Sequence, residues 1–389
     1  MRLAYRYRLF TNANQERELA AALETHRRLY NVCLDYKVLA YQCFGASLNY
    51  CDFSRWFKGQ RRTNPYFARL NFSAAQATMR RLDKSFANFF RRVAAGAAQP
   101  GYPRFKGRDW FDSIEYFAYR DGVRLTGHRL YVQHVGAIRV KMHRPVEGVI
   151  KTVRLKREAG KWFVIFSCEL ADAAVTPSVL PPVGIDVGLT HFLTTSEGTQ
   201  EANPRYLRDT LPALRRANRS VSRKKKGGAN RHKAVVRLQK VHALIANQRR
   251  EHHYQVACRL VLAFGFIVVE RLNISAMLKN DKLSRAIADV AWGSFAGILK
   301  HKAEKAGAQV VEVDPKGTSQ QCSQCGQEVR KDLSVRWHDC PHCGLSLDRD
   351  HNAARNILAR GLARTAPAGV NVGHKLKRSR RSRRLQATE

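Results

Sequence analysis

Four of the nine cysteines form two Cys-x-x-Cys pairs near the C-terminus: Cys322 with Cys325, and Cys340 with Cys343. Fourteen residues separate the pairs, and Gly326 and Gly344 follow them, where glycine permits the tight turn of a metal-binding knuckle. Two such knuckles bring four thiolates to one ion, which is typical of structural zinc. A redox dithiol is the alternative, but two pairs at this spacing disfavour it. Because four thiolates close the coordination shell, we expect a zinc ribbon that stabilises the fold and hydrolyses nothing.

The chain carries a large excess of positive charge. Its 69 Lys and Arg residues outnumber its 31 Asp and Glu residues by 38. Self-repulsion on this scale raises the free energy of the compact state unless a polyanion screens it, and nucleic acid is the commonest polyanion. The composition therefore favours a nucleic-acid-binding protein and disfavours an enzyme of small metabolites.

Two segments concentrate this charge. Residues 215–250 contain 13 Lys or Arg residues and no acid, and residues 360–389 contain nine basic residues and one acid. A helix that merely faces solvent normally carries both signs of charge, so we expect residues 215–250 to contact phosphate groups. The candidate contacts are Arg223, Lys224, Lys225, Lys226, Arg231 and Lys233. The tail is expected to be disordered in the free protein.

The sequence predicts neither an export signal nor a membrane segment. Arg2, Arg6 and Arg8 interrupt the first apolar residues, and the longest apolar run, 260–269, is about half of what a bilayer requires. We therefore expect a soluble, intracellular protein without a membrane partner.

Hydrophobic periodicity predicts a mixture of helices and strands. In the N-terminal half we expect a strand over 2–10, a helix from about Asn12, a helix over 75–93, and a hairpin of 149–155 with 162–170. In the C-terminal half we expect strands over 183–188, 192–195, 264–269 and 309–313, helices over 205–258 and 284–306, and a last helix from about Asn352.

Three carboxylates occupy positions suited to metal binding. Asp186 lies within a strand, Glu270 ends an apolar strand, and Asp350 lies at the start of the last helix. Each alone has an ordinary interpretation, as a turn residue, a strand-end surface charge or a helix N-cap. Strand ends and a helix start of one α/β domain can converge, however, and three carboxylates then suit a pair of Mg²⁺ or Mn²⁺ ions. Two such ions can stabilise both the attacking water and the leaving oxygen of a phosphodiester.

The order of these motifs resembles the TnpB family of transposon-encoded, RNA-guided DNA nucleases, which have a RuvC-like core and are similar to type V CRISPR effectors. The resemblance rests on GIDVG at 184–188, ERLNI at 270–274, the two cysteine pairs and DRDHNAARNI at 348–357. It spans nearly the whole chain, more loosely in the N-terminal half. It implies that Asp186, Glu270 and Asp350 are the catalytic triad that holds Mg²⁺ or Mn²⁺, with Asp348 as the alternative third acid. The four cysteines are the implied zinc ligands.

The resemblance also implies a cytoplasmic, nucleoid-associated protein of a prokaryote, with an α+β multidomain fold. The implied parts are a β-rich wedge domain over 1–172 with a helical recognition insertion at about 12–98, a linker over 173–182, an RNase H-like (RuvC) α/β nuclease domain over 183–365 with a zinc ribbon inserted at 316–347, and a basic tail over 366–389.

The implied function is RNA-guided cleavage of DNA by a two-metal mechanism. A guide RNA encoded by the transposon would pair with double-stranded target DNA, opened to single strands beside a short motif that the protein reads. One alternative is an RNA-guided repressor that does not cut, which would not need three carboxylates. Another is a guide-independent transposase or resolvase, which a zinc ribbon just before the last Asp disfavours.

Overall fold

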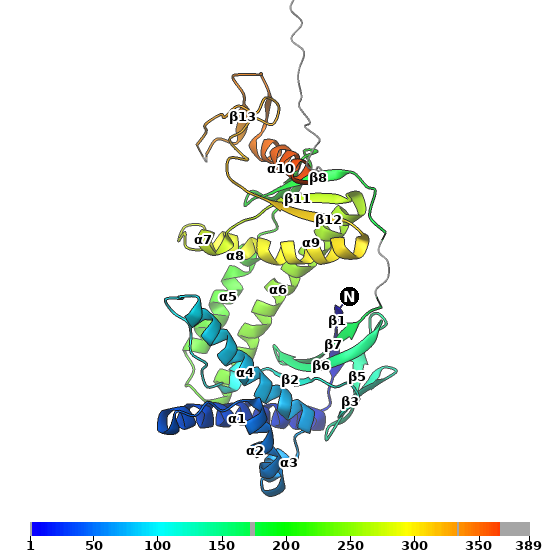
Figure 1. The fold of residues 1–389 in the computed structure, drawn as a ribbon, viewed down its shortest axis with the longest axis vertical. Helices are drawn as coiled ribbons and strands as arrows, with labels where there is room; N and C mark the ends of the chain where they lie inside the picture. The colour runs from blue at the N-terminus through cyan, green and yellow to red at the C-terminus, as the bar shows by residue number, and fades with distance from the viewer. Residues whose placement is uncertain (1, 172–175, 333, 366–389) are drawn as a thin grey trace, which may run out of the picture. The chain divides into compact units, whose positions relative to one another are not determined.

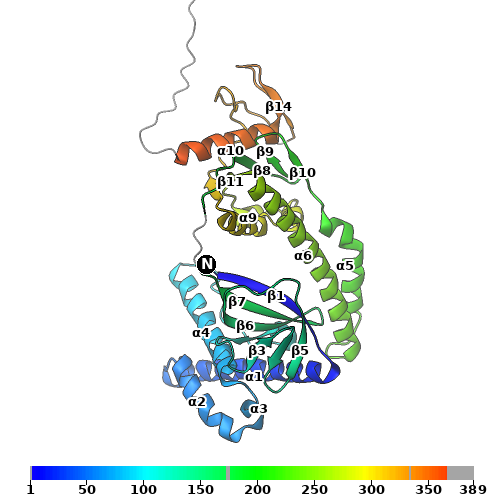
Figure 2. The same ribbon diagram turned by 90° about the vertical axis from the view of Figure 1, so that its right-hand side faces the viewer.

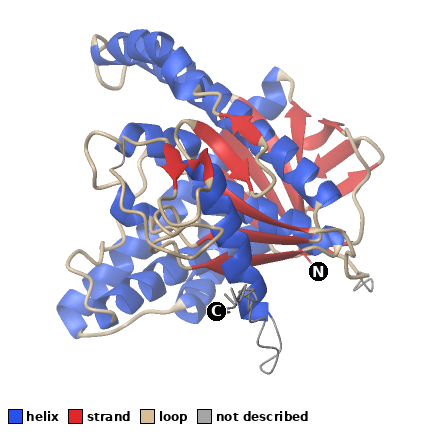
Figure 3. Cartoon of the chain, turned by 90° about the horizontal axis from the view of Figure 1, so that it is seen from above, coloured by secondary structure: helices blue, strands red, loops and turns tan. Residues whose placement is uncertain are grey.

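A computed structural model describes residues 2–171, 176–332 and 334–365. The contacts between residues divide the chain into two compact units. Unit 1 comprises Met1–Ala174 and Ala213–Ala243, and unit 2 comprises Val175–Pro212 and Leu244–Glu389. Each unit combines helices with a β-sheet (Figure 3). The predicted tail over 366–389 and residues 173–175 of the predicted linker lie outside the described residues.

A seven-stranded antiparallel sheet forms the core of unit 1, in the order β2-β6-β7-β1-β5-β4-β3. Its strands are β1 (Arg2–Phe10), β2 (Ser113–Tyr116), β3 (Val123–Thr126), β4 (Arg129–Val132), β5 (Gly136–Lys141), β6 (Val149–Glu158) and β7 (Lys161–Glu169). Burial alternates along β1, as the sequence predicts for a strand with one face in the core. The predicted hairpin is confirmed as β6 and β7, and Figure 2 shows β7 between β6 and β1.

Four α-helices lie between β1 and β2 in the sequence. They are α1 (Ala13–Phe44), α2 (Tyr50–Thr63), α3 (Pro65–Ala68) and α4 (Phe72–Ala94), and a 3-10 turn, η1 (Arg108–Trp110), follows them. Asn12 caps α1, because its side chain accepts a hydrogen bond from the backbone N–H of Gln15 at 2.8 Å. The predicted helices near Asn12 and over 75–93 are therefore confirmed as α1 and α4.

Unit 2 contains a mixed five-stranded sheet in the order β10-β9-β8-β11-β12, in which β8, β11 and β12 are parallel. The strands are β8 (Pro182–Val187), β9 (His191–Thr195), β10 (Gln200–Ala202), β11 (Phe266–Glu270) and β12 (Gln309–Val313). A further two-stranded sheet joins β13 (Trp337–Asp339) to β14 (Ser346–Asp348).

The remaining helices are α5 (Tyr206–Ser222), α6 (Ala229–Ala263), α7 (Ile274–Met277), α8 (Ser284–Val290), α9 (Trp292–Ala306) and α10 (Arg349–Thr365). The prediction of one helix over 205–258 is wrong, because residues 223–228 interrupt it. Four consecutive cations repel one another there, and Gly227 has φ +84°. The single helix predicted over 284–306 is likewise two helices, α8 and α9, because Ala291 between them adopts the left-handed conformation with φ +53°. None of the described helices is both long and apolar enough to cross a membrane.

Helix α10 covers one face of the unit 2 sheet, opposite α9 (Figure 1). Two glycines allow this close approach. A Cβ atom on Gly184 would lie 2.1 Å from the carbonyl oxygen of Ala354, and one on Gly361 would lie 2.3 Å from Cγ2 of Val268. Contacts this short would force the backbones apart, so glycine at both positions keeps α10 against β8 and β11.

Candidate active site and metal centre

Asp186 and Glu270 lie side by side on neighbouring parallel strands. The register of β8 and β11 pairs Ile185 with Val269, and each carboxylate is the next residue along its strand. Both residues are thus at the carboxyl ends of their strands, the edge at which α/β sheets commonly bind ligands. The ends of these two strands, with their carboxylates, therefore lie side by side, as the sequence predicts.

Asp350 approaches the same edge from α10. Its Oδ2 atom lies 4.0 Å from the position that a Cβ atom on Gly188, two residues beyond Asp186, would occupy. Two arginines face the carboxylate: Arg349 at 3.2 Å from Oδ1, and Arg336 at 3.8 Å from Oδ2. Only 14% of the Asp350 side chain is exposed, so these cations partly balance a charge that water cannot reach freely.

Asp348 and Asp350 have different roles in the fold. Oδ1 of Asp348 accepts hydrogen bonds from the backbone N–H groups of Asp350 at 2.9 Å and His351 at 3.1 Å, which is how an N-cap residue satisfies a helix start. The negative charge of Asp350, in contrast, raises the pKa of Asp186. The structure therefore brings Asp350 toward the other two carboxylates and uses Asp348 to begin α10.

The other two carboxylates of the site disfavour the ionisation of Asp186. Burial raises the pKa of Asp186 well above its ordinary value, and the negative charges of Glu270 and Asp350 raise it further. Burial also raises the pKa of Glu270, although a hydrogen bond from Thr318 opposes this. Like charges held together at the end of a sheet need a counter-ion, and hard carboxylate oxygens are the ligands that Mg²⁺ prefers. The donor set therefore fits divalent cations.

Carboxylates of a two-ion site need not all reach one ion. Among the described residues, the four cysteines alone bring three or more ligand atoms of His, Cys, Asp or Glu within 4.8 Å of one another. The three carboxylates are therefore spread more widely than a single-ion site would be. Two-metal sites hold their ions about 3.5–4 Å apart, so their ligands span a longer distance.

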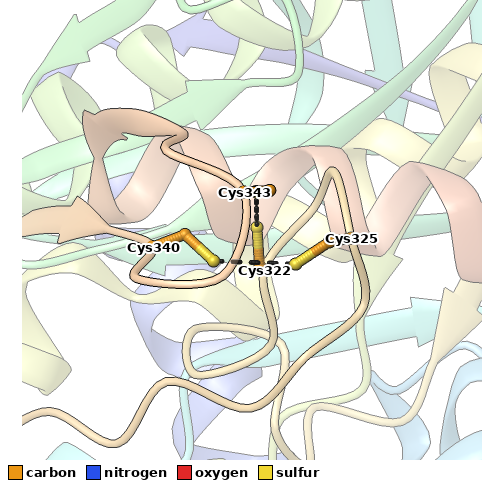
Figure 4. A group of neighbouring side chains, drawn as sticks. All are labelled: Cys322, Cys325, Cys340 and Cys343. Atoms are coloured by element: carbon orange, nitrogen blue, oxygen red, sulfur yellow. Dashed lines mark hydrogen bonds between the residues drawn. The ribbon is translucent and has the colours of Figure 1, made fainter. Parts of the chain in front are cut away.

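The four cysteine sulfurs converge as predicted (Figure 4). Sγ of Cys322 lies 3.6 Å from Sγ of Cys343, and the same distance separates Cys325 from Cys340. A tetrahedral zinc site with bonds of about 2.3 Å has sulfur–sulfur edges of about 3.8 Å. The positions of these thiols thus fit a tetrahedral ion, and we call them the four-cysteine cluster.

Sequence analysis missed a row of polar side chains on α10. Asn352, Asn356 and Arg360 recur every four residues, so they share one face of the helix. Each donates to backbone carbonyls of the segment before or within the first cysteine knuckle: Asn352 to Gln321, Asn356 to Thr318 and Gln321, and Arg360 to Asp314 and Lys316. We call these three residues the polar stripe of α10. Their four-residue spacing was the signal that could have revealed them.

The contact between Thr318 and Glu270 was also not predicted from the sequence. The hydroxyl of Thr318 lies 2.5 Å from Oε1 of Glu270, 48 positions earlier in the chain. No local pattern marks this contact, since it depends on how α10 holds the segment after β12 against the sheet.

The six predicted phosphate contacts lie around the α5–α6 connection. Arg223, Lys224, Lys225 and Lys226 follow α5, whereas Arg231 and Lys233 lie at the start of α6. All six are at least partly exposed, and no ion pair is found for any of them within the described part of the chain. Arg249, further along α6, is instead paired with Asp289 at 2.7 Å. The six cations thus form a basic surface whose charge is not neutralised by described carboxylates.

The two units, the carboxylate edge and the four-cysteine cluster define a mixed α/β protein of the Cas12/TnpB type. A solved structure titled "Structure of the mini-RNA-guided endonuclease CRISPR-Cas_phi3" shares the fold, with a TM-score of 0.51 and 9% identity over 93% of this chain and 92% of that one. Three family profiles match: "Helix-turn-helix domain" at 1–46, "Probable transposase" at 165–281 and "Cas12f1-like, TNB domain" at 292–357. Within 2–46 the structure has β1 and the single helix α1.

The chain belongs to the TnpB family, the OrfB transposase family of IS605 elements, as its motifs predict. A "Putative RNA-guided DNA endonuclease" of Streptomyces pristinaespiralis is 35% identical over 377 residues, covering 93% of this chain and 90% of the relative. "Putative RNA-guided DNA endonuclease InsQ" of Escherichia coli K12 is 31% identical over 306 residues, covering 74% of each.

Proposed function

We propose that this chain is the RNA-guided DNA endonuclease of a transposable element, with Asp186, Glu270 and Asp350 as its catalytic residues. The observation that carries the proposal is the convergence of these carboxylates from β8, β11 and α10 at one sheet edge, where burial and like charge raise the pKa of Asp186. Perturbed carboxylates of this kind cluster at functional sites. The names of the two relatives support the same activity.

We assign the predicted wedge domain to unit 1 and the predicted nuclease domain to unit 2, although residues 213–243 of the predicted nuclease domain belong to unit 1. The seven-stranded sheet with α1–α4 between β1 and β2 supports a wedge domain over 1–172 with a helical insertion. The mixed sheet carrying two of the three carboxylates supports an RNase H-like (RuvC) nuclease domain over 183–365. The ribbon over 316–347 is then an insertion between β12 and α10, in which the four cysteines would hold a structural Zn²⁺ ion.

The residues of the site have distinct tasks. Asp186, Glu270 and Asp350 would hold Mg²⁺ or Mn²⁺, which supplies the Lewis acidity for activating water and the scissile phosphate. Asp186 is the shared member of the site, because the charges of both other carboxylates raise its pKa. Glu270 accepts a hydrogen bond from the Thr318 hydroxyl, and the backbone of Asp350 is fixed by the cap that Asp348 provides.

The proposed partners are a guide RNA encoded by the transposon and the target DNA that it selects. Pairing between RNA and DNA would read the sequence, while the protein would read a short duplex motif and hold phosphates. The basic surface around the α5–α6 connection suits the second task, since its six cations carry no described ion pair.

Cleavage by a carboxylate variant tests the proposed activity. The chain is expressed with the RNA transcribed from the DNA around its gene, and the purified complex is given a duplex matching the guide. Asp186→Ala is expected to abolish cleavage and to leave RNA affinity within about twofold. Cleavage by Asp186→Ala at the parental rate would show that the triad is wrongly assigned.

The bound RNA tests guidance separately from cleavage. After purification at high salt, which weakens nonspecific phosphate contacts, we expect one RNA species with a constant structured part and a variable end. Heterogeneous RNA that is fully sensitive to ribonuclease would instead favour a guide-independent transposase or resolvase.

A further inference from the structure

We propose that Thr318 is a positioning residue for Glu270, and that Asn356 of the polar stripe holds Thr318 in place for this task. The proposal rests on the carboxylate site of the proposed function. It assigns a role to a residue that lies outside the triad. The hydroxyl of Thr318 contacts β11 and the turn after β12, and its backbone carbonyl accepts a hydrogen bond from α10.

The Thr318 hydroxyl has two acceptors within reach but one hydrogen to donate. Oε1 of Glu270 lies at 2.5 Å, and the carbonyl oxygen of Pro315 lies at 3.0 Å. The shorter distance is in the range of an O–H···O⁻ bond to a charged acceptor, which is also the stronger of the two. The hydroxyl therefore donates to Glu270 and restricts the rotation of its carboxylate. Since Thr318 is only 4% exposed, little water competes for this bond.

The backbone of Thr318 is held independently of its side chain. Asn356, which is 7% exposed, donates from Nδ2 to the carbonyl oxygen of Thr318 at 2.8 Å and to that of Gln321 at 2.6 Å. Arg360 fixes the preceding turn through the carbonyl oxygens of Asp314 and Lys316. This buried amide is costly to remove, because the carbonyl oxygen of Thr318 then loses its bond to Asn356, whereas the carbonyl oxygen of Gln321 keeps the bond from Asn352.

These contacts make one path from α10 to Glu270. Asn356 bonds the main chain of Thr318, and Thr318 bonds the carboxylate. The carbonyl oxygen of Pro315 alone could satisfy the hydroxyl of a purely structural threonine, so the shorter contact with Glu270 is the one that indicates a positioning role. Removing a group that orients a metal ligand in this manner typically changes metal affinity or activity 10- to 100-fold.

The first experiment measures Mn²⁺ affinity of the full chain bound to its RNA, together with DNA cleavage and melting temperature. Thr318→Val removes the hydroxyl but keeps the shape, and we expect Mn²⁺ affinity to fall about tenfold or more. Thr318→Ser keeps the hydroxyl and is expected to stay within about threefold of the parent. Thr365→Val is the matched control, because the hydroxyl of Thr365 donates to helix carbonyls of α10 and, among the described residues, to no carboxylate. Parental Mn²⁺ affinity in Thr318→Val, or equal decreases in the valine and serine variants, would overturn the proposal.

The second experiment is a double-mutant cycle with Asn356→Ala. If Asn356 acts through Thr318, its removal should weaken Mn²⁺ binding, and adding Thr318→Val should weaken it little further. Independent, additive effects would show that Asn356 does not hold Thr318 for this purpose.

Asp186→Ala separates this inference from the proposed function. If Asp186→Ala binds Mn²⁺ as the parent does, the carboxylate site itself is wrongly assigned. If it no longer binds Mn²⁺ while Thr318→Val still does, only the positioning role is wrong.

Discussion

Asn352 and Ser323 are joined by a hydrogen bond of 2.9 Å, from the backbone N–H of Ser323 to Oδ1 of Asn352. Ser323 lies inside the first cysteine knuckle, and Asn352 follows Asp350 by two residues on α10. Asn352 is fully buried, and its Nδ2 atom donates to the carbonyl oxygen of Gln321 at 2.8 Å. The knuckle that holds Cys322 and Cys325 is therefore hydrogen-bonded directly to α10, the helix that supplies the third carboxylate.

Removal of the cysteine-bound metal should consequently affect both stability and cleavage. Cys340→Ser is expected to lose zinc and to lower the free energy of unfolding of unit 2 by several kcal/mol, since metal binding is coupled to folding. Cleavage should fall with it, because the knuckle no longer supports α10. Metal content, melting temperature and cleavage rate check this. Cys258→Ser, a cysteine of α6 outside the cluster, is the control and should keep its zinc. A zinc-free Cys340→Ser that cuts normally would contradict the expected link.

Two neighbouring acids allow a matched test of the third catalytic position. Asp350→Asn removes the carboxylate that acts on Asp186, so we expect cleavage to fall by at least about a hundredfold. Asp348→Asn keeps an oxygen that can cap α10, because Asn is as good an N-cap as Asp. Its cleavage rate should stay within about threefold of the parent. Initial rates at saturating Mg²⁺ measure both, and the reverse order of effects would make Asp348 the third acid.

Four strands of unit 2, β8, β9, β11 and β12, could be predicted because their residues carry the signal themselves. The apolar run that ends at Glu270, for example, is typical of a buried strand. The strands β10, β13 and β14 were not predicted, since three residues are too few to show a period. The helix break at Ala291 could not be predicted, since alanine favours helix and its left-handed conformation arises from tertiary packing. The break between α5 and α6 at residues 223–228 was not predicted, although the consecutive glycines Gly227 and Gly228 are typical of a loop.

The parts of the candidate site that could be predicted are those in which the type and spacing of the residues indicate the chemistry. Carboxylates at strand ends and paired cysteines are visible in a sequence, because their types and spacing are unusual. The contact of Thr318 with Glu270 joins residues 48 positions apart and is created by α10. Threonine has many ordinary roles, so only the folded structure distinguishes this one.

The close packing of α10 on β8 makes Gly184 a sensitive position. Gly184→Ala would place a methyl group 2.1 Å from the carbonyl oxygen of Ala354, so α10 must shift, and we expect stability to fall by several kcal/mol together with reduced cleavage. Gly297→Ala in α9 is the control, because an added Cβ meets nothing within 4 Å. It should leave stability unchanged or raise it by up to about 1 kcal/mol. Denaturant unfolding of both variants checks this, and equal stability would mean that α10 adjusts without strain.

The basic surface should govern RNA affinity through charge. Replacing Arg223, Lys224, Lys225 and Lys226 by Gln is expected to weaken RNA binding and to reduce the slope of log K against log salt by up to about 0.7–0.9 for each phosphate that is no longer neutralised. The control removes the same charge from four cations that already pair with carboxylates: Arg28, Lys151, Arg154 and Lys300. Binding measured from low to high salt compares the two variants. Equal slopes would show that the basic surface has no special role.

His26 should make the stability of unit 1 depend on pH. It is buried in α1 with Nδ1 2.9 Å from Oγ1 of Thr78, and burial, with a smaller contribution from the charge of Arg81, lowers its pKa to about 3. An unfolded chain protonates histidine near pH 6.5, so between about pH 6.5 and 3 the unfolded state binds the proton and the folded state does not. Stability therefore falls as the pH drops through this window, by up to about 1.4 kcal/mol per pH unit. His26→Gln should show a shallower decline in denaturant unfolding between pH 7 and 5, whereas His232→Gln, exposed on α6, should follow the parent. Identical declines in all three proteins would show that His26 is not the group responsible.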